Sequence, residues 1–343
     1  MTGIDIMTVP EPDPEQFFGP VESSLDGLRR SYVFLEALDM GIFSSLAEGK
    51  DIGEIARDLG LEAVMAGLFC DTLCDMGLLE RRGERYANTP AASAYLVRSS
   101  PYYQGRSFDH LRRDLPRWQS LGEVLRSGPL IMKRDEFFNE RWICAIAERS
   151  LCGGVQRVAS QVSEAIRPEQ WGRMLDLGGG HGLYAIAFCA IHPTLEAVVF
   201  DRPEIVPVTA RYIERFGATR VATMAGDYTT DDIGSGYDML FSSFTGIGAE
   251  PRMIPKLTSA LVPGGHLIIR SHQEHVREDA LGNLGWNFFT VEGGKGGRRR
   301  FSDPGMVSPA RYREELTDHG LEVLRHWEPD KFSEITIARR VRG

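Results

Sequence analysis

The stretch "MLDLGGGHGLYA", residues 174–185, decides the fold. A short apolar run leads directly into four glycines, and a second apolar segment follows them. These glycines are Gly178, Gly179, Gly180 and Gly182. Because glycine has no Cβ atom, the chain can turn here with a positive φ, and a ligand can lie against the backbone. A helix that begins near His181 would offer its amino-terminal amides to a polar or anionic group. The stretch therefore predicts a ligand-binding turn between a strand and a helix.

From residue 173 onward, short apolar strands alternate with helices. We expect strands at 173–178, 196–201, 221–227, 237–243, 266–272, 321–327 and 334–341, and helices at 181–193, 204–217, 250–265 and 308–320. This alternation predicts an α/β fold with a Rossmann-like, mostly parallel sheet and helices on both faces. The short connection between the last two strands predicts an antiparallel end strand. The glycine turn then lies at the carboxyl edge of the sheet, where ligands bind in such folds.

The amino-terminal part predicts a separate, mainly helical module. Residues 1–19 contain three prolines and indicate an extended arm, and apolar residues at helical spacing predict a helix over 21–49. Two short helices over 52–59 and 61–76, then two strands over 78–89, form the pattern of a winged helix. The expected domains are therefore a winged-helix domain at 1–100, a helical segment at 101–170 and a Rossmann-like domain at 171–343.

A winged helix suggests DNA binding, but the charges oppose it. The second short helix carries Glu62, Asp71 and Asp75 and neither Lys nor Arg, on which phosphate and base contacts rely heavily. The formal net charge of -9 would also repel a duplex. Since this helix is unusually apolar, we expect it to pack against another helix, and we expect no nucleic-acid partner.

Composition indicates a soluble globular protein, with 42% hydrophobic and 25% charged residues in 343. The five cysteines form no CxxC pair and no metal site, which favours reduced thiols in a cytoplasmic protein. The first residues lack the basic and apolar regions of a signal peptide. No stretch approaches about 18 uninterrupted apolar residues, so we expect no membrane partner.

Two acids stand at the ends of the strands that follow the glycine turn. Asp201 ends the second strand about 20 residues after the glycines, which is the position of an acid that holds ribose hydroxyls. Asp227 ends the third strand, where a carboxylate can accept a hydrogen bond from an adenine amino group, with Tyr228 beside the base. No Lys-Ser or Lys-Thr follows the glycines, which excludes a P-loop.

The form "DLGGGHG", with Asp176 two residues before the first glycine, resembles the class I methyltransferases, which bind S-adenosylmethionine (SAM). Within that class the chain is similar to the small-molecule O-methyltransferases, which include plant caffeate-type and bacterial natural-product enzymes. The segments "FDRP" at 200–203, "AGDY" at 225–228, "LVPGGHLII" at 261–269 and "GGK" at 293–295 stand where that family has them. The winged helix matches too, so the resemblance covers nearly the whole chain.

The resemblance implies SAM as cofactor, S-adenosylhomocysteine (SAH) as its product and a homodimer formed through the amino-terminal domain. Gly178 and Gly180 would approach SAM closely, and the acids and Tyr228 would hold its ribose and adenine. The expected cofactor-binding residues are Asp176, Gly178, Gly179, Gly180, Asp201, Gly226, Asp227, Tyr228 and Ser242. The alternative for the acids is a helix cap or a loop hydrogen bond.

The chain departs from the plant pattern in its acid–base residues. Plant members have a histidine base soon after the fourth strand, but "LFSSFTGIGAEP", residues 240–251, contains none. Two supporting glutamates are also absent, one near Ser271 and one in "GGKGGRRR", residues 293–300. General-base help contributes about 10²–10⁴-fold, whereas orientation can supply on the order of 7–11 kcal/mol. Transfer by positioning therefore remains feasible for an acidic or already nucleophilic acceptor.

His272 and His275, after the fifth strand, are the candidate catalytic residues. His272 could act as the base, the pair could hold a metal ion with Glu274, or both could be solvated loop residues. Aromatic side chains could line an acceptor pocket or belong to the core. The pocket candidates are Phe138, Trp142, Trp286, Phe288 and Phe289. The basic loop "KGGRRRF", residues 295–301, could attract an anionic acceptor or be ordinary solvated surface.

The sequence thus predicts a cytoplasmic, homodimeric, SAM-dependent methyltransferase that acts on a small aromatic or acidic molecule. O-methylation is the default, by positioning and without the usual histidine base. C-, N- or S-methylation, with or without a metal, stays open. Two rivals also stay open: an enzyme that binds SAM without methylating, and a winged-helix DNA-binding regulator.

Overall fold

The computed structural model describes residues 7, 9, 11–133, 136, 139–166, 171–273, 280–291 and 306–341, without the side chains of residues 286 and 291. The chain forms two compact units, Met1–Phe108 and Asp109–Gly343, each with its own hydrophobic core. The division into three parts expected from the sequence stays a prediction. No helix among the described residues has the length and hydropathy needed to cross a bilayer.

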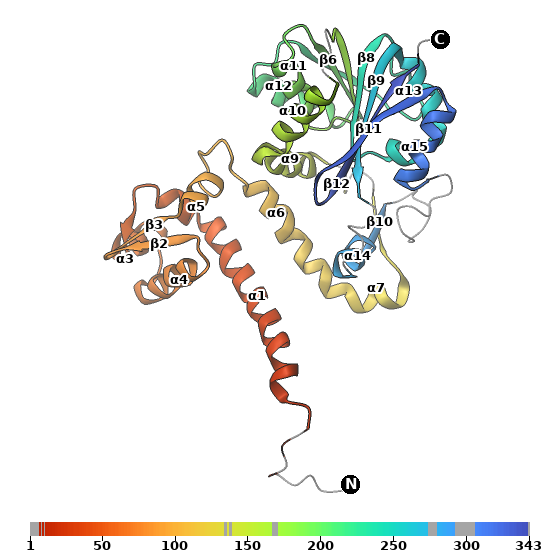
Figure 1. Ribbon diagram of the computed structural model, residues 1–343. Coiled ribbons are helices and arrows are strands. Elements are labelled where there is room, and N and C mark those ends of the chain that lie inside the picture. The colour runs from red at the N-terminus through yellow and green to blue at the C-terminus, as the bar shows by residue number, and fades with distance from the viewer. Residues whose placement is uncertain are drawn as a thin grey trace. The chain divides into compact units, whose positions relative to one another are not determined.

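The first unit contains helices and a small antiparallel sheet with strand order β1-β3-β2 (Figure 1). Its elements are α1 (Pro14–Met40), α2 (Ile42–Ser45), β1 (Lys50–Asp51), α3 (Ile52–Leu59), α4 (Ala63–Asp75), β2 (Leu79–Arg82), β3 (Arg85–Asn88) and α5 (Pro90–Tyr95). Asp51 and Glu54 form a capping box at the start of α3, and Gly60 ends this helix with φ 67°. The two short helices and the hairpin therefore follow from local signals.

The expectation of an extended arm and of one helix to residue 49 is wrong at both ends. Helix α1 begins at Pro14, with the Asp13 side chain accepting a hydrogen bond from the Glu15 amide. Proline is favourable at a first helical position, because the amide it lacks would have no partner there. At the other end, Gly41 has φ 73° and stops the helix, and the short helix α2 follows.

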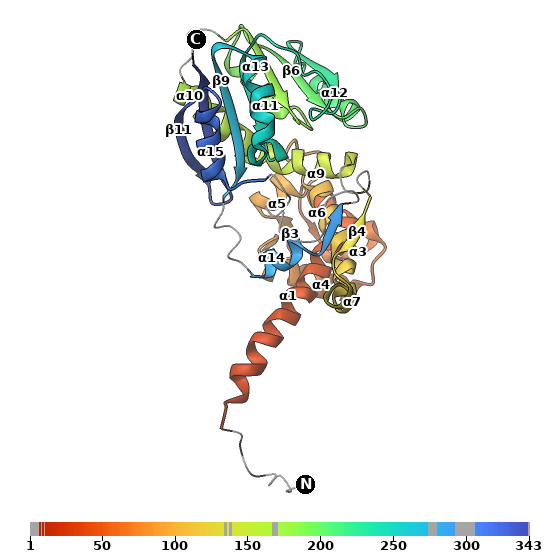
Figure 2. The same ribbon diagram turned by 90° about the vertical axis from the view of Figure 1, so that its right-hand side faces the viewer.

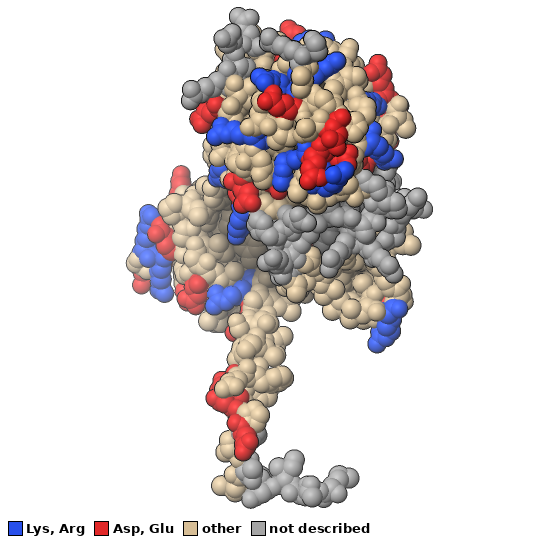
Figure 3. Space-filling view, turned by 45° about the vertical axis from the view of Figure 1, so that its right-hand side comes forward, with Lys and Arg blue, Asp and Glu red and all other residues tan. Residues whose placement is uncertain are grey.

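Helix α4 packs against α1 and α3 through Cys70 and Leu73, as expected, but a second apolar face of this helix has no partner among the described residues of the first unit. Val64, Met65 and Leu68 on this helix are 68%, 63% and 58% exposed. Helix α1 likewise exposes Leu28 and Tyr32, and the face of this helix that Figure 3 shows is mostly uncharged. Both helices thus present apolar surface that the first unit does not cover.

The second unit is built on a seven-stranded sheet of order β11-β12-β9-β8-β5-β6-β7. Its strands are β5 (Arg173–Leu177), β6 (Glu196–Asp201), β7 (Val221–Ala225), β8 (Tyr237–Ser243), β9 (Leu261–His272), β11 (Leu321–Asp330) and β12 (Ser333–Arg340). The pairs from β7 across to β9 are parallel, whereas β12 is antiparallel to both β9 and β11. The mostly parallel sheet with an antiparallel end is therefore confirmed.

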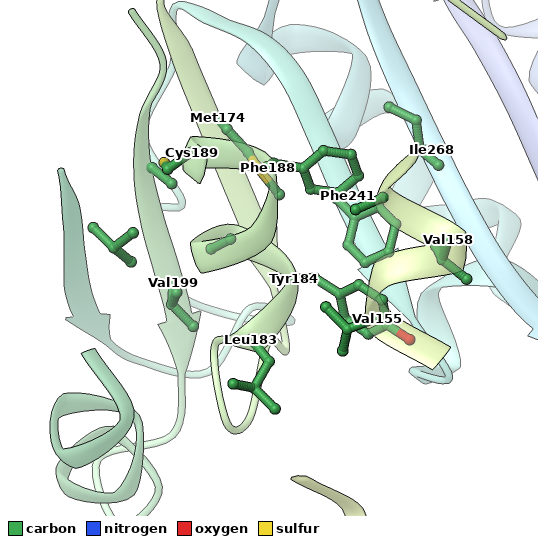
Figure 4. Close-up of a cluster of buried hydrophobic side chains, with 14 of the residues drawn as sticks. Val155, Val158, Met174, Leu183, Tyr184, Phe188, Cys189, Val199, Phe241 and Ile268 are labelled. Atoms are coloured by element: carbon green, nitrogen blue, oxygen red, sulfur yellow. The ribbon is translucent and has the colours of Figure 1, made fainter. Parts of the chain in front are cut away.

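Helices cover both faces of this sheet (Figure 1). One face carries α10 (Val155–Ile166), α11 (Leu183–Ile191) and α12 (Val206–Arg215), and the other carries α13 (Ile254–Ala260) and α15 (Pro309–Asp318). In the core on the α11 side of the sheet, the centroid of the Phe241 ring of β8 lies 4.9 Å from that of Tyr184 and 5.4 Å from that of Phe188, both on α11 (Figure 4). This packing holds the start of α11, and with it the glycine turn, against the sheet.

The chain before this sheet is mostly helical, as expected, but it also contains a strand. The helical elements are α6 (Gly105–Asp114), a 3-10 helix (Leu115–Ser120), α7 (Leu121–Ser127), α9 (Glu140–Arg149) and a π-helical turn (Ser150–Gly154). Strand β4 (Leu130–Met132) pairs in parallel with β10 (Phe289–Val291), which follows α14 (Ala280–Trp286) (Figure 2). Three-residue strands show no alternation, so sequence periodicity could not reveal this pair.

Strand β9 begins at Leu261, although "LVPGG" was expected to end a helix and turn. Gly264 has φ 86°, and a Cβ at Gly265 would lie 2.9 Å from the Val262 carbonyl oxygen and 3.0 Å from that of Tyr237. The chain therefore bends tightly into the sheet at these glycines, beside a register shift in the β8–β9 pair. The segment before α13 is also 3-10 rather than α, at Gly246–Ala249 and Pro251–Met253.

Candidate functional site at the carboxyl edge of the sheet

The glycine turn connects β5 to α11 at the carboxyl edge of the sheet, as the sequence predicts. Gly178, Gly180 and Gly182 have φ values of 69°, 55° and 70°, in the left-handed region that favours glycine. The Gly178 amide donates to the Phe200 carbonyl oxygen at 2.8 Å, which ties the turn to β6. Backbone conformation alone therefore accounts for three of the four glycines.

Neighbouring side chains add a second reason for the bare backbone. A Cβ at Gly178 would lie 2.6 Å from Thr245 Cγ2, and one at Gly182 would lie 2.8 Å from Thr209 Cγ2. A Cβ at Gly179 would lie 2.6 Å from Asp176 Cγ. The protein's own packing thus demands glycine at these positions, in addition to any ligand.

Asp176, at the end of β5, is 1% exposed. Its Oδ2 atom has no hydrogen-bond partner among the described residues. Burial, with the negative charge of Asp201 as a second cause, raises the pKa of Asp176 to about 7. An orphaned buried oxygen is a feature that a bound ligand can explain.

Asp201 lies at the end of β6 and contacts the glycine turn directly. Its Oδ2 atom accepts from the Gly180 amide at 2.8 Å, and its Oδ1 atom accepts from the Arg202 amide at 2.7 Å. Burial raises the pKa of Asp201, although both backbone hydrogen bonds act to lower it. Each carboxylate oxygen has more than one lone pair, so Asp201 can still accept from ribose hydroxyls.

Asp227 follows β7 and makes the loop hydrogen bonds that we gave as the alternative to a ligand. Its Oδ1 atom accepts from the Thr229 amide at 2.9 Å and from the Thr229 hydroxyl at 2.6 Å. Gly226 is buried, and a Cβ there would lie 2.5 Å from Phe200 Cζ. Tyr228 stands beside the glycine turn, with its Cε1 atom 3.8 Å from where a Gly178 Cβ would lie.

Ser242, at the end of β8, is buried and engaged with its neighbours. Its hydroxyl donates to the Leu177 carbonyl oxygen at 3.1 Å and lies 2.6 Å from the Thr245 hydroxyl. Thr245 is therefore a site residue that sequence reasoning missed. Thr245 lies just after β8, in the segment where plant members of the family have their histidine, and it packs on Gly178.

His181 is the second residue at this edge whose role the sequence did not reveal. It is 5% exposed, and its Nδ1 atom accepts from the Leu183 amide at 3.1 Å. Burial lowers the pKa of His181 to about 4, so the ring is neutral at physiological pH. It caps the start of α11 as a neutral acceptor.

Phe244 connects the ends of β8 and β9 and places His272. It is the non-glycine residue with positive φ among the described positions, at 55°. Its amide donates to the Arg270 carbonyl oxygen at 2.8 Å, and its ring stacks on His272 with centroids 4.3 Å apart. The Arg270 guanidinium carbon lies 4.5 Å from the Phe244 centroid. A conformation that costs about 1–3 kcal/mol persists where its surroundings enforce it, often at functional sites.

Arg270 is itself held by three partners. Its guanidinium donates to the Tyr184 hydroxyl at 2.6 Å, to Ser333 Oγ at 3.1 Å and to Asp330 Oδ2 at 3.0 Å. The Arg270 side chain is only 11% exposed, and its positively charged guanidinium packs against the Phe244 ring. Arg270, Phe244 and His272 therefore form one stack at the ends of β8 and β9.

The pocket candidates are only partly within the described residues. Trp142 lies on α9, with its ring 4.5 Å from that of His110, and the next residue, Ile143, reaches within 3.4 Å of a Cβ position at Gly180. Phe289 lies in β10, while Phe288 is 3% exposed and packs on Trp118.

The remaining predicted site residues lie outside the described part of the chain. They are Phe138, Glu274, His275, the side chain of Trp286 and the basic loop 295–301. The described residues contain no group of three metal-ligating side chains.

Two protein-family models match the sequence. An O-methyltransferase domain matches residues 131–296, and an O-methyltransferase dimerisation domain matches residues 23–98. The first match spans the glycine turn and the strand ends described above. The second covers most of the first unit.

Similar proteins include several that are named as methyltransferases. The chain is 29% identical to an uncharacterized protein of Methanocaldococcus jannaschii, over 93% of this chain and 88% of that protein. It is also 29% identical to the tetracenomycin polyketide synthesis 8-O-methyl transferase of Streptomyces glaucescens, over 74% and 79%. An N,N-dimethyltransferase of Streptomyces rimosus is 28% identical, over 68% and 72%.

Among solved structures, human N-acetylserotonin methyltransferase in complex with SAM matches with a TM-score of 0.72. The match covers 97% of this chain and 100% of that chain, at 20% sequence identity. This likeness extends over both units and supports the fold.

Proposed function

Because the chain belongs to the family of SAM-dependent O-methyltransferases, with both the methyltransferase and the dimerisation domain, we propose that it methylates a small acceptor molecule. The observation that carries this proposal is the carboxyl edge of β5 and β6. There a bare turn and the amides at the start of α11 stand beside Asp201, which bonds to the Gly180 amide at 2.8 Å. This arrangement fits an adenosyl ligand.

The residues at this edge offer chemical groups that suit each part of SAM. We propose that Asp201 holds the ribose, that Asp227 and Tyr228 face the adenine, and that the turn lies along the rest of the ligand. The proposed contact residues are Asp176, Gly178, Gly179, Gly180, Asp201, Gly226, Asp227, Tyr228 and Ser242. When bound, SAM supplies an electrophilic methyl group on a sulfonium. The orphaned Asp176 Oδ2 atom and the positive φ values of the turn support this assignment.

We assign His272 as the residue that takes the acceptor proton. Its ring stacks on Phe244, whose neighbour Thr245 packs on the glycine turn, so a chain of contacts links His272 to the cofactor edge. Imidazole near neutral pH is a suitable general base. The stack would hold the His272 ring in one orientation, so that His272 could act in place of the absent family histidine.

Oxygen is the proposed acceptor atom, because the family domain is that of O-methyltransferases. The N,N-dimethyltransferase among the relatives keeps nitrogen as the second candidate. A panel of phenols, hydroxynaphthoates, amines and thiols, each incubated with SAM, tests the choice by mass spectrometry. We expect SAH and a singly methylated phenol or hydroxynaphthoate. Failure of the purified protein to bind either SAM or SAH would remove the whole proposal, and product formation without SAH would favour the non-methylating alternative.

The role of His272 is tested with two phenols of different acidity. With a phenol whose pKa is near 10, His272→Ala should lower kcat by about 10²–10⁴-fold, because the proton must be removed. With a phenol already ionised at the assay pH, the same variant should lose far less. The matched control is His319→Ala, which changes the exposed histidine that follows α15. Equal losses for both phenols would exclude a base role.

We also propose a homodimer through the first unit. The dimerisation domain matched there and the exposed apolar residues of α1 and α4 support it. Helix α4 carries no Lys or Arg, and its Asp71 accepts a hydrogen bond from Tyr86, which does not favour a DNA-binding role.

A further inference from the structure

Asp176 is a buried carboxylate whose environment does not favour its charge. It is 1% exposed, and its Oδ2 atom has no hydrogen-bond partner among the described residues. Gly179 closes over it, since a Cβ there would lie 2.7 Å from that same Oδ2 atom. Leaving a buried carboxylate oxygen unpaired costs stability, so its presence at the ligand edge calls for a functional reason.

The groups that face Asp176 do not neutralise it. From β6 comes Asp201, a second carboxylate, whose two oxygens each accept one hydrogen bond, from the Gly180 and Arg202 amides at 2.8 and 2.7 Å. From α11, the Ala185 amide donates a hydrogen bond to Asp176. Tyr184 of the same helix accepts a hydrogen bond from the Arg270 guanidinium at its hydroxyl.

The neighbours of Asp176 on the turn and on β8 carry no charge. His181, on the turn, is uncharged because burial lowers its pKa to about 4. Phe241, the partner of Asp176 on β8, has no titratable group. Two carboxylates therefore share a buried edge, and among the residues that the structure describes no cation directly offsets the charge of Asp176. Burial and Asp201 together raise the pKa of Asp176 to about 7.

We propose that Asp176 distinguishes SAM from SAH by charge: it holds a proton in the ligand-free protein near neutral pH, releases it when SAM binds and regains it when SAH is formed. This inference rests on the proposed function of the site. SAM carries a sulfonium cation where SAH carries a neutral thioether, and the two are otherwise alike in charge. A cation placed near a desolvated carboxylate favours its ionised form.

The proton balance follows the methyl transfer. On SAM binding, the Asp176 proton would pass to water, and the sulfonium charge would stabilise the ionised carboxylate. Transfer removes the methyl group and the positive charge together, after which Asp176 takes a proton from water. By linkage, each unit by which SAM lowers the pKa of Asp176 raises the affinity for SAM over SAH about tenfold. Asp176 would thus favour release of the product.

Isothermal titration calorimetry of the purified full chain tests the proposal without any acceptor. SAM, SAH and sinefungin, which has an amine in place of the sulfonium, are each titrated at pH 7 in phosphate and in Tris. The dependence of the binding enthalpy on buffer ionisation gives the protons exchanged. We expect SAM and sinefungin to release about half a proton more than SAH, because a group is half-protonated at its pKa.

The variant Asp176→Asn should abolish this difference in proton release. It should also lower the preference for SAM over SAH at pH 8, by about tenfold if SAM lowers the pKa by one unit. Glu322→Gln removes an exposed carboxylate paired with Arg339 and should change neither quantity. Equal proton release with SAM and SAH in the wild-type protein would overturn the proposal, whether or not the variant folds. Absence of binding by all three ligands would instead contradict the proposed function.

Discussion

At the residue scale, His181 is a buried histidine that stays neutral at the carboxyl edge of the sheet. Its pKa in the folded protein is about 4, below the value of about 6.5 expected for the unfolded chain. The folded state therefore binds fewer protons between these values, and the stability that His181 contributes is lost as pH falls from 6.5 toward 4. Asp176, whose pKa is raised, acts in the opposite direction, with its contribution lost as pH rises toward 7.

His181→Asn should reduce the loss of stability in acid. The Asn side-chain oxygen can accept from the Leu183 amide as Nδ1 does, but it cannot be protonated in this range. The unfolding temperature of the variant should therefore fall less than that of the wild type between pH 7 and pH 5. His319→Asn, at an exposed histidine, serves as the control. The same acid dependence in wild type and His181→Asn would contradict the assignment.

Gly178→Ala and Gly217→Ala separate backbone strain from packing. Both glycines have positive φ, 69° and 57°, but a Cβ at Gly217 meets nothing within 4 Å, whereas one at Gly178 meets Thr245 at 2.6 Å. We expect both to lose about 1 kcal/mol of stability from strain, and Gly178→Ala alone to weaken SAH binding by tenfold or more.

Adding Thr245→Ser to Gly178→Ala removes the methyl group that clashes and should restore part of the SAH affinity. Calorimetric titration with SAH measures both effects. Equal affinities for the Gly178 and Gly217 variants would show that Thr245 does not press on the turn.

At the element scale, α1 has an apolar face that its sequence predicts, but the sequence does not say what covers that face. Leu25, Leu28 and Tyr32 follow one another at helical spacing, yet they are 47%, 45% and 60% exposed. The spacing predicts the helix correctly, because it reports an apolar face. It does not say whether the same chain or another covers that face.

Leu28→Glu should divide the dimer that we propose. A carboxylate in an apolar interface is costly to desolvate, so the mass measured by light scattering should fall from two chains to one. Leu125→Glu, at a residue of α7 that is 69% exposed, should leave the mass unchanged. A wild-type protein that is monomeric at micromolar concentration, or a variant that stays dimeric, would exclude this helix as the interface.

Sequence patterns predict strands, helices and turns correctly where the residues that carry the pattern are adjacent in the chain. The apolar run of β5, the glycines and the start of α11 are adjacent in sequence, so the turn and its place at the sheet edge could be predicted. The pairing of β4 with β10 could not, because it joins two three-residue strands that are far apart in the chain. The same limit explains Thr245, which meets Gly178 only because β8 lies beside β5.

At the scale of the whole molecule, the two units should respond differently to ligand. The residues that we assign to SAM all belong to Asp109–Gly343. Hydrogen exchange with and without SAH should therefore show slower exchange at 178–183, 201–202 and 226–229, where amides face the site or its acids. The hairpin of β2 and β3 should be unaffected. Protection spread equally over both units would contradict this assignment.

The sequence by itself determined the α/β class, the glycine turn, the acids at the next strand ends and the absence of the family's histidine. Each of these is written in a few consecutive residues, since periodicity and turn chemistry act over short distances. The tertiary structure alone decided that Thr245 presses on Gly178 and that Asp176 is buried beside a second carboxylate. It also decided that Arg270, Phe244 and His272 stack on one another at the ends of β8 and β9. These contacts depend on which strands are neighbours and in what register, so they exist only once the sheet has formed.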